Sequence, residues 1–110
     1  MDRNEALREF KSRKTPRGVF AVRCKPAIQV WVDSSPNLDG AQNGIWFQLR
    51  MGNHSNKPLQ AAWNEYGERA FQFEILERLD DDVEPTGLKD LLAERKRHWA
   101  ATLASPTVYP

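Results

Sequence analysis

The chain has almost no cysteine, no long hydrophobic run and no large excess of either charge. The single cysteine, Cys24, among 110 residues excludes an intrachain disulfide and is typical of a reducing compartment. No segment approaches the roughly 18 consecutive apolar residues of a membrane-spanning helix. Residues 1–14, MDRNEALREFKSRK, lack the apolar stretch of a secretion signal. We therefore expect a cytoplasmic protein that makes no contact with membranes.

The charges nearly balance, since 16 Lys and Arg face 15 Asp and Glu for a formal net charge of +1. Proteins that bind nucleic acid mainly through bulk electrostatics carry a larger basic excess, so the composition does not favour that class. The length suits one domain with one modest core. We predict a single domain over residues 1–110, with its core over residues 18–104.

Turn residues and apolar periodicity divide the chain into short elements. Asparagine caps precede two helical patterns and glycine stops follow them, while the strand patterns are short or alternating. The order predicts an α+β domain in which helices flank a small three-stranded antiparallel sheet. The expected elements are a helix over 2–13, strands over 19–24 and 29–33, helices over 38–51 and from 57 to 66, a strand over 71–76, a long helix after Thr86 and a short tail over 105–110.

Two segments resemble the GIY-YIG nuclease family. Gly18-Val19-Phe20 and Trp31-Val32-Asp33 stand where that family has Gly-Ile-Tyr and Tyr-Ile-Gly on neighbouring strands. The stretch from Leu49 to Leu79 is similar to the intron-encoded and phage members, because many residues match at fixed spacing. The resemblance runs from about Gly18 to Trp99 and implies the same three-stranded sheet. The matching residues are Leu49, Gly52, His54, Asn56, Leu59, Gln60, Trp63, Asn64, Gly67, Phe71, Phe73, Leu76 and Glu77.

The resemblance also implies a chemistry, because GIY-YIG enzymes cut a phosphodiester with one divalent cation. In the family a first-motif tyrosine helps to activate water, a second-motif tyrosine lines the pocket, an arginine stabilises the developing charge and a glutamate holds the metal. A histidine lies one turn after the arginine. The motif positions of this chain, including the glycine of the second motif, hold other residues instead: Phe20, Trp31, Asp33, Ala41, Ile45 and Lys96.

These replacements remove the groups that the reaction needs. Phe20 has no phenolic oxygen, and the indole of Trp31 can only donate a hydrogen bond. Asp33 would place a negative charge beside the phosphate, and the ammonium of Lys96 repels a cation. We therefore predict a catalytically inactive pseudonuclease that uses no cofactor.

An active enzyme stays open as an alternative. The assignment of Lys96 to the metal position takes Trp99 as the family's anchor on the last helix. A different register makes Glu94 the metal ligand, and Glu77 is a further candidate. Under that alternative the protein is a Mg²⁺-dependent DNA endonuclease with a rearranged site.

Basic residues suggest where nucleic acid binds, and we expect the binding to be weak, sequence-independent and independent of magnesium. His54 matches a family position near the substrate, although a structural loop histidine explains it equally well. A protein-interaction domain without a nucleic-acid role also stays open, favoured by the small net charge, as does a helix-turn-helix interpretation of residues 38–66. The candidate nucleic-acid contacts are Arg13, Lys14, Arg17, Arg50, His54, Lys57 and Lys96.

Overall fold

The computed structural model describes residues 16–79 and 85–108. The helix predicted over residues 2–13 lies outside the described residues, and so do the candidate contacts Arg13 and Lys14. The described residues form three strands, three α-helices and one short 3-10 helix. These elements are β1 (Gly18–Cys24), β2 (Gln29–Ser35), α2 (Leu38–Met51), α3 (Lys57–Tyr66), η1 (Glu68–Ala70), β3 (Phe71–Arg78) and α4 (Pro85–Leu103).

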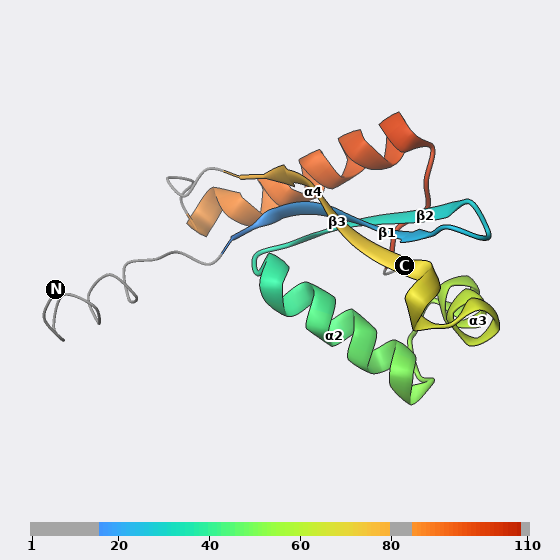
Figure 1. Ribbon diagram of the computed structural model, residues 1–110. Helices are drawn as coiled ribbons and strands as arrows, with labels where there is room; N and C mark the ends of the chain where they lie inside the picture. Colours follow the sequence, from blue (N-terminus) through green and yellow to red (C-terminus); the bar gives the residue numbers. More distant parts are fainter. Residues whose placement is uncertain (1–15, 80–84, 109–110) are drawn as a thin grey trace, which may run out of the picture.

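The strands make one antiparallel sheet in the order β2-β1-β3. This confirms the predicted α+β fold with a small three-stranded antiparallel sheet flanked by helices. Strands β2 and β3 each run two residues beyond the predicted ends, to Ser35 and Arg78, because β1 offers backbone partners along its whole length. Helix α4 covers one face of the sheet, and α2 and α3 lie on the other (Figure 1).

Gly18 is required at the start of β1 by the close approach of β3. The ladder between β1 and β3 shifts register between Val19 and Phe20. A Cβ atom built on Gly18 would overlap the carbonyl oxygen of Glu77. Any larger residue would therefore push the two strands apart at this irregularity.

Asparagine caps begin the two central helices. The side-chain oxygen of Asn37 accepts a hydrogen bond from the Gly40 N–H at 2.9 Å, and that of Asn56 accepts one from the Leu59 N–H at 3.1 Å. Gly52 ends α2 in the left-handed conformation, with φ of 76°. The local sequence signals placed both helices at the bounds that the structure has.

The main core lies between the sheet and the pair α2 and α3. The rings of Phe20 and Phe73 stack with centroids 4.8 Å apart, and Trp46 meets Trp63 edge-on at 5.6 Å. Trp31 is also buried here, with 2% of its surface exposed. Cys24 is a free cysteine that packs in this core as a small buried side chain.

The segment predicted as a short tail joins the fold. Val32 donates its N–H to the carbonyl of Pro106 at 2.9 Å, and Val108 donates its N–H to the carbonyl of Val32 at 3.1 Å. The Val108 side chain is completely buried. Residues 106–108 therefore cover part of the outer edge of β2 and complete the core. Within residues 16–79 and 85–108, none of the helices has the length and hydropathy needed to cross a membrane.

Candidate functional site

A cavity of about 360 Å³ opens between the end of β2 and the first turns of α2. Three of the predicted motif positions line it together, namely Phe20, Ala41 and Ile45. Its polar atoms come from the hydroxyls of Ser34 and Ser35 and from the Asn37 region. None of the residues that line this cavity carries a charged side chain.

Two glycines of α2 leave this cavity open. Gly40 and Gly44 lie one turn apart on the helix and both line the cavity. A Cβ atom on Gly44 would meet nothing within 4 Å, while one on Gly40 would press on the capping side chain of Asn37. Glycine inside a helix is destabilising relative to alanine, and Gly40 and Gly44 lie where the helix borders this cavity.

A second cavity, of about 440 Å³, lies between the end of β2 and α4 and shares Ser34 with the first. Here Lys96 Nζ lies 3.6 Å from Asp33 Oδ1. The Asp33 side chain is 8% exposed and that of Lys96 is 31% exposed. The backbone N–H of Ser34 also donates to Asp33 Oδ1, at 2.8 Å. Lys89 lines the same cavity.

The Asp33–Lys96 pair does not fit a divalent cation. Hard cations such as Mg²⁺ require several oxygen ligands, and an ammonium group next to the carboxylate opposes their charge. Asp33 supplies the one carboxylate among the residues that line the two cavities. Among the described residues, no three His, Cys, Asp or Glu side chains are grouped closely enough to hold a metal ion.

Trp31 does not line either of these cavities, although it shares a sheet face with Phe20. The register sets Phe20 opposite Asp33 and Val22 opposite Trp31, so Trp31 lies two residues along β2 from the residue that faces Phe20. Trp31 instead borders a separate pocket near the β1–β2 turn. The structure therefore separates two positions that the resemblance placed in one site.

His54 lies inside the turn between α2 and α3 and is 2% exposed. Its Nδ1 accepts a hydrogen bond from the Asn56 N–H at 3.0 Å, and its own N–H donates to Gln60 Oε1 at 3.0 Å. Burial lowers the pKa of His54, which keeps the ring neutral at neutral pH. This geometry gives His54 a structural role, and its burial does not favour a direct phosphate contact.

The other basic residues predicted to contact nucleic acid differ in their ion pairs and in their exposure to solvent. Arg50 makes a two-pronged ion pair with Glu68, with both N–O distances 2.8 Å. That hydrogen bond lowers the pKa of the Glu68 carboxyl. Lys57 is exposed at the first position of α3, and Arg17 is half-buried just before β1. Lys57 is therefore better placed than Arg50 or Arg17 to meet an external anion.

The amide of Gln60 does not face solvent as a DNA-reading residue would. Gln60 is 8% exposed, and its Nε2 donates to the Leu49 carbonyl and to Asn64 Oδ1, both at 3.0 Å. These bonds fasten α3 to the end of α2. The arrangement does not support the helix-turn-helix interpretation of this segment.

Comparison with known proteins gives one consistent result. No protein-family model matches the chain, and no curated protein matches its sequence. The catalytic domain of homing endonuclease I-TevI is similar in structure, with a TM-score of 0.69 and 27% identity over 80% of this chain and 88% of that chain. A point mutant of the catalytic domain of intron endonuclease I-TevI matches with a TM-score of 0.70 and 26% identity, over 82% of this chain and 86% of that chain.

The chain is a GIY-YIG endonuclease-like domain. In this domain the two alternative metal ligands lie apart from the cavities. Glu94 is exposed on α4 and lines neither of them. Glu77 Oε1 accepts hydrogen bonds from Arg95 Nε and Trp99 Nε1, each at 2.8 Å. Burial opposes ionisation of Glu77, but these two hydrogen bonds and nearby charges outweigh it and lower its pKa.

Sequence reasoning missed two features of the GIY-YIG endonuclease-like domain. It assessed Asp33 and Lys96 separately and did not foresee that they form an ion pair. A signal was present, because an acidic and a basic residue depart from the family pattern at two positions of one site. It also missed Lys89, for which the sequence carried no motif.

Proposed function

We propose that this GIY-YIG endonuclease-like domain binds nucleic acid without hydrolysing it. The observation that carries the proposal is the Asp33–Lys96 ion pair, which stands where the resemblance implies a metal site. The two similar solved structures are described as the catalytic domain of an endonuclease, so nucleic acid is the ligand class that the likeness suggests.

The groups around the first cavity support the loss of hydrolysis. A general base must hold a basic atom near the attacking water, and it works best when its pKa lies near the working pH. Phe20, Ala41 and Ile45 offer no such atom, and the hydroxyls of Ser34 and Ser35 have no buried base beside them among the residues that line the cavity. Water in this cavity would meet no side chain able to take its proton.

The ion pair supports weak binding. A phosphate near Lys96 would be attracted by the ammonium and repelled by the neighbouring carboxylate of Asp33. Lys89 adds one further positive charge on the same cavity. The net attraction is therefore small and needs no divalent cation. Each phosphate contact that forms makes the affinity fall as the salt concentration rises.

The first test measures binding and cutting separately. Fluorescence anisotropy of labelled single- and double-stranded DNA and RNA, with Mg²⁺ and with EDTA, should give the same Kd in both conditions and a Kd that rises with salt. Supercoiled plasmid incubated with Mg²⁺ should stay uncut. Cutting by the wild type that Glu94→Gln abolishes would establish the alternative of an active endonuclease.

A pair of charge reversals on α4 tests the cavity itself. Lys96→Glu should weaken binding about three- to tenfold, because it turns an ion pair into two repelling carboxylates facing the phosphate. The matched control is Arg97→Glu, which makes the same change of charge at an exposed position that lines neither cavity. Equal effects of the two reversals would contradict binding at this cavity.

One observation favours the second candidate, a protein-binding domain. Phe47 and Met51 lie one turn apart on α2 and are 61% and 62% exposed. A pair of exposed apolar side chains suits contact with another protein. Failure of the wild type to bind any nucleic acid at low salt would leave this candidate in place of the first.

A further inference from the structure

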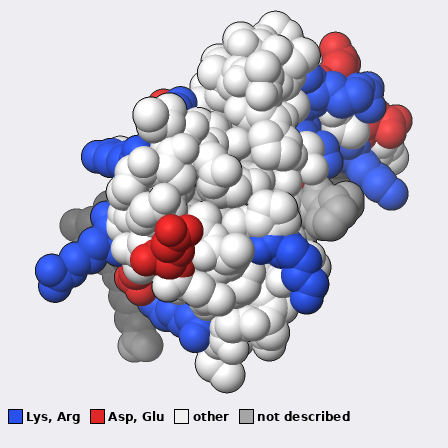
Figure 2. Space-filling view, turned by 90° about the vertical axis from the view of Figure 1, so that its right-hand side faces the viewer, with Lys and Arg blue, Asp and Glu red and all other residues white. Residues whose placement is uncertain are grey.

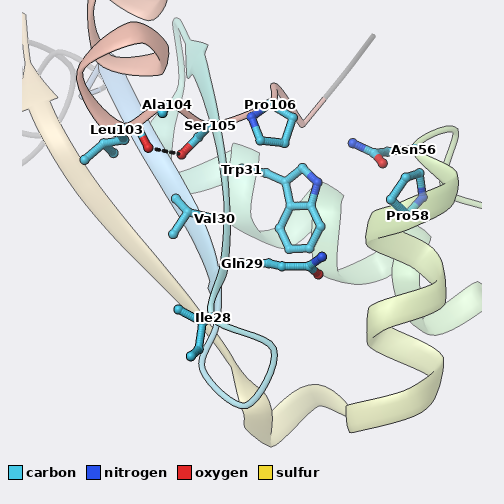
Figure 3. A pocket seen from close by; sticks show the side chains of 10 residues that line it. All are labelled: Ile28, Gln29, Val30, Trp31, Asn56, Pro58, Leu103, Ala104, Ser105 and Pro106. Carbon is cyan, nitrogen blue, oxygen red and sulfur yellow. Dashed lines mark hydrogen bonds between the residues drawn. The ribbon is translucent and has the colours of Figure 1, made fainter.

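A neutral pocket of about 390 Å³ lies at the other end of β2, near the β1–β2 turn. Residues 28–31 form one wall, Asn56 and Pro58 at the start of α3 form the second, and residues 103–106, from the last residue of α4 onward, form the third (Figure 3). None of these residues carries a charge. The molecular face shown in Figure 2 is uncharged over most of its area, with Lys and Arg side chains mainly toward its margin and a group of Asp and Glu side chains on the face itself.

Trp31 lines this pocket with an indole N–H that can donate a hydrogen bond. The residue is 2% exposed, and the edge of the indole that carries the nitrogen is turned toward Asn56 and Pro58 (Figure 3). The indole N–H can donate a hydrogen bond but cannot accept one. A ligand in the pocket that carries a hydrogen-bond acceptor could therefore pair with it.

Two side-chain amides line the pocket, that of Asn56 and that of Gln29, and they differ in their hydrogen bonds. Asn56 Nδ2 donates to the carbonyls of Thr107 and Val108, at 3.0 and 2.8 Å, and its oxygen caps α3. Gln29 is exposed, and its amide extends on the same side of β2 as the nitrogen of Trp31 (Figure 3). Gln29 can both donate to a ligand and accept from it.

Ile28 borders the pocket with an exposed apolar side chain and a strained backbone conformation. Its side chain is 92% exposed, and its φ of 53° lies in the left-handed region, which a β-branched residue rarely adopts. Neither the exposure nor the backbone conformation helps the isolated protein. A strained residue of this kind often marks a functional contact, and Ile28 lines the same cavity as Trp31.

The lining selects the chemistry of the ligand. Burying a phosphate or carboxylate among uncharged walls is unfavourable, so the buried part of the ligand is neutral. The apolar side chains of Val30, Leu103 and Pro58 suit a ring, and Gln29 with Trp31 suits a ring edge that carries both acceptors and donors. Lys57 lies between the lining residues Asn56 and Pro58 in the chain, and it is exposed and can meet a phosphate outside the pocket.

We propose that this pocket takes up one unpaired nucleobase of a nucleic-acid strand, with the backbone phosphates held outside by basic side chains that include Lys57. This inference rests on the proposed function for the strand and on the pocket for the base. A base stacked inside a duplex cannot enter. The domain therefore prefers nucleic acid that contains an unpaired base.

Three labelled duplexes of equal length test the proposal by fluorescence anisotropy. One is fully paired, one carries a single bulged base, and one carries an abasic residue at the bulge. The wild type should bind the bulged-base duplex roughly three- to tenfold more tightly than the other two. Trp31→Phe and Gln29→Ala should each reduce this preference while leaving the affinity for the paired duplex unchanged.

Matched variants separate the pocket from general effects. Trp46→Phe makes the same exchange in the core at a residue that does not line the pocket, and it should leave the preference unchanged. Ile28→Asn should raise the melting temperature, because Asn tolerates the left-handed conformation, and yet reduce the preference. Ile75→Asn, at the exposed isoleucine on β3, should do neither. Gln29 and Ile28 are at the surface, so their variants remain informative if Trp31→Phe does not fold.

A titration with free cytidine and adenosine, followed by the indole N–H signals in NMR, distinguishes the two proposals. If nucleosides shift the Trp31 signal but no nucleic acid binds, the pocket proposal holds for a free base and the proposed function fails. If all three duplexes bind equally and the pocket variants change nothing, the proposed function holds and the pocket proposal is overturned. If neither nucleosides nor nucleic acids bind, both are wrong.

Discussion

The two sides of the sheet are held by different forces. On the side of α2 and α3, the buried polar contacts join neutral groups, as where Asn56 bonds the C-terminal segment and His54 bonds the turn before α3. The ion pair of Arg50 with Glu68 on this side lies at the exposed surface. On the side of α4, the contacts include the ion pair of Lys96 with Asp33 and that of Arg95 with Glu77. Neutral contacts hardly respond to salt, while ion pairs that reach solvent do.

The difference between the two sides bears on function. The neutral side holds the aromatic core and fixes the orientation of the two central helices. The charged side borders the cavity that contains Asp33 and Lys96, and its charges remain near enough to solvent to respond to an anion. The stable frame and the responsive surface are therefore built from different interactions. Four measurements test whether the two sides differ in this way.

The largest effect is expected for Asn56→Ala on the neutral side. The substitution removes the cap of α3 and leaves the carbonyls of Thr107 and Val108 without their donor. The free energy of unfolding should fall by about 3 kcal/mol. Urea denaturation at low and at high salt should give the same loss. Asn53→Ala, at an exposed asparagine in the same turn, is the control and should change little.

Lys96→Glu should have the next largest effect, on the charged side. It removes the partner of the nearly buried Asp33 and adds a like charge, so stability should fall by about 2 kcal/mol at low salt. Added salt should recover part of the loss, and Mn²⁺ should recover more, since two carboxylates then face each other. Lys96→Met removes the charge without adding one and should show no recovery with Mn²⁺. A loss that is the same at every salt concentration would contradict the contrast.

Glu77→Gln should lower stability by about 1 kcal/mol at neutral pH, through weaker bonds to Arg95 and Trp99. The pKa of Glu77 lies below its ordinary value of 4.5 in the folded protein. Its contribution is therefore complete above that value and is lost as the pH falls through the folded pKa. In thermal unfolding, the melting temperature of Glu77→Gln should fall less steeply with decreasing pH than that of the wild type. Glu65→Gln, at an exposed glutamate on α3, is the control and should show the same fall of melting temperature at acid pH as the wild type.

The smallest effect concerns His54, a titratable group on the neutral side. Burial holds its pKa below the ordinary 6.5. Just below pH 6.5 the His54 imidazole therefore stays neutral in the folded protein, while in the unfolded chain it takes up a proton. Stability should therefore decline as the pH falls below 6.5. His54→Asn keeps an acceptor near Nδ1 and should remove this decline. An unchanged pH slope in that variant, with His98→Asn as the exposed control, would show that His54 is not its source.

Local sequence signals predicted the central helices because their ends depend on near neighbours. Asn37 and Asn56 bond the N–H groups three residues ahead, and Gly52 adopts a left-handed conformation that few residues tolerate. Strands β2 and β3 extend beyond their predicted ends because a strand end depends on its partner. The structure brings Phe20, Ala41 and Ile45, which occupy three motif positions of the resemblance, to one cavity.

Local bonding and residue type are therefore enough to predict the two central helices and the middle of each strand. Tertiary structure alone decided that Lys96 reaches Asp33, that Val108 enters the core, and that Trp31 faces a different pocket from Phe20. Each of these contacts joins segments far apart in the chain. Their geometry follows from how α4 and the C-terminal segment pack along the edge of β2, which no local pattern encodes.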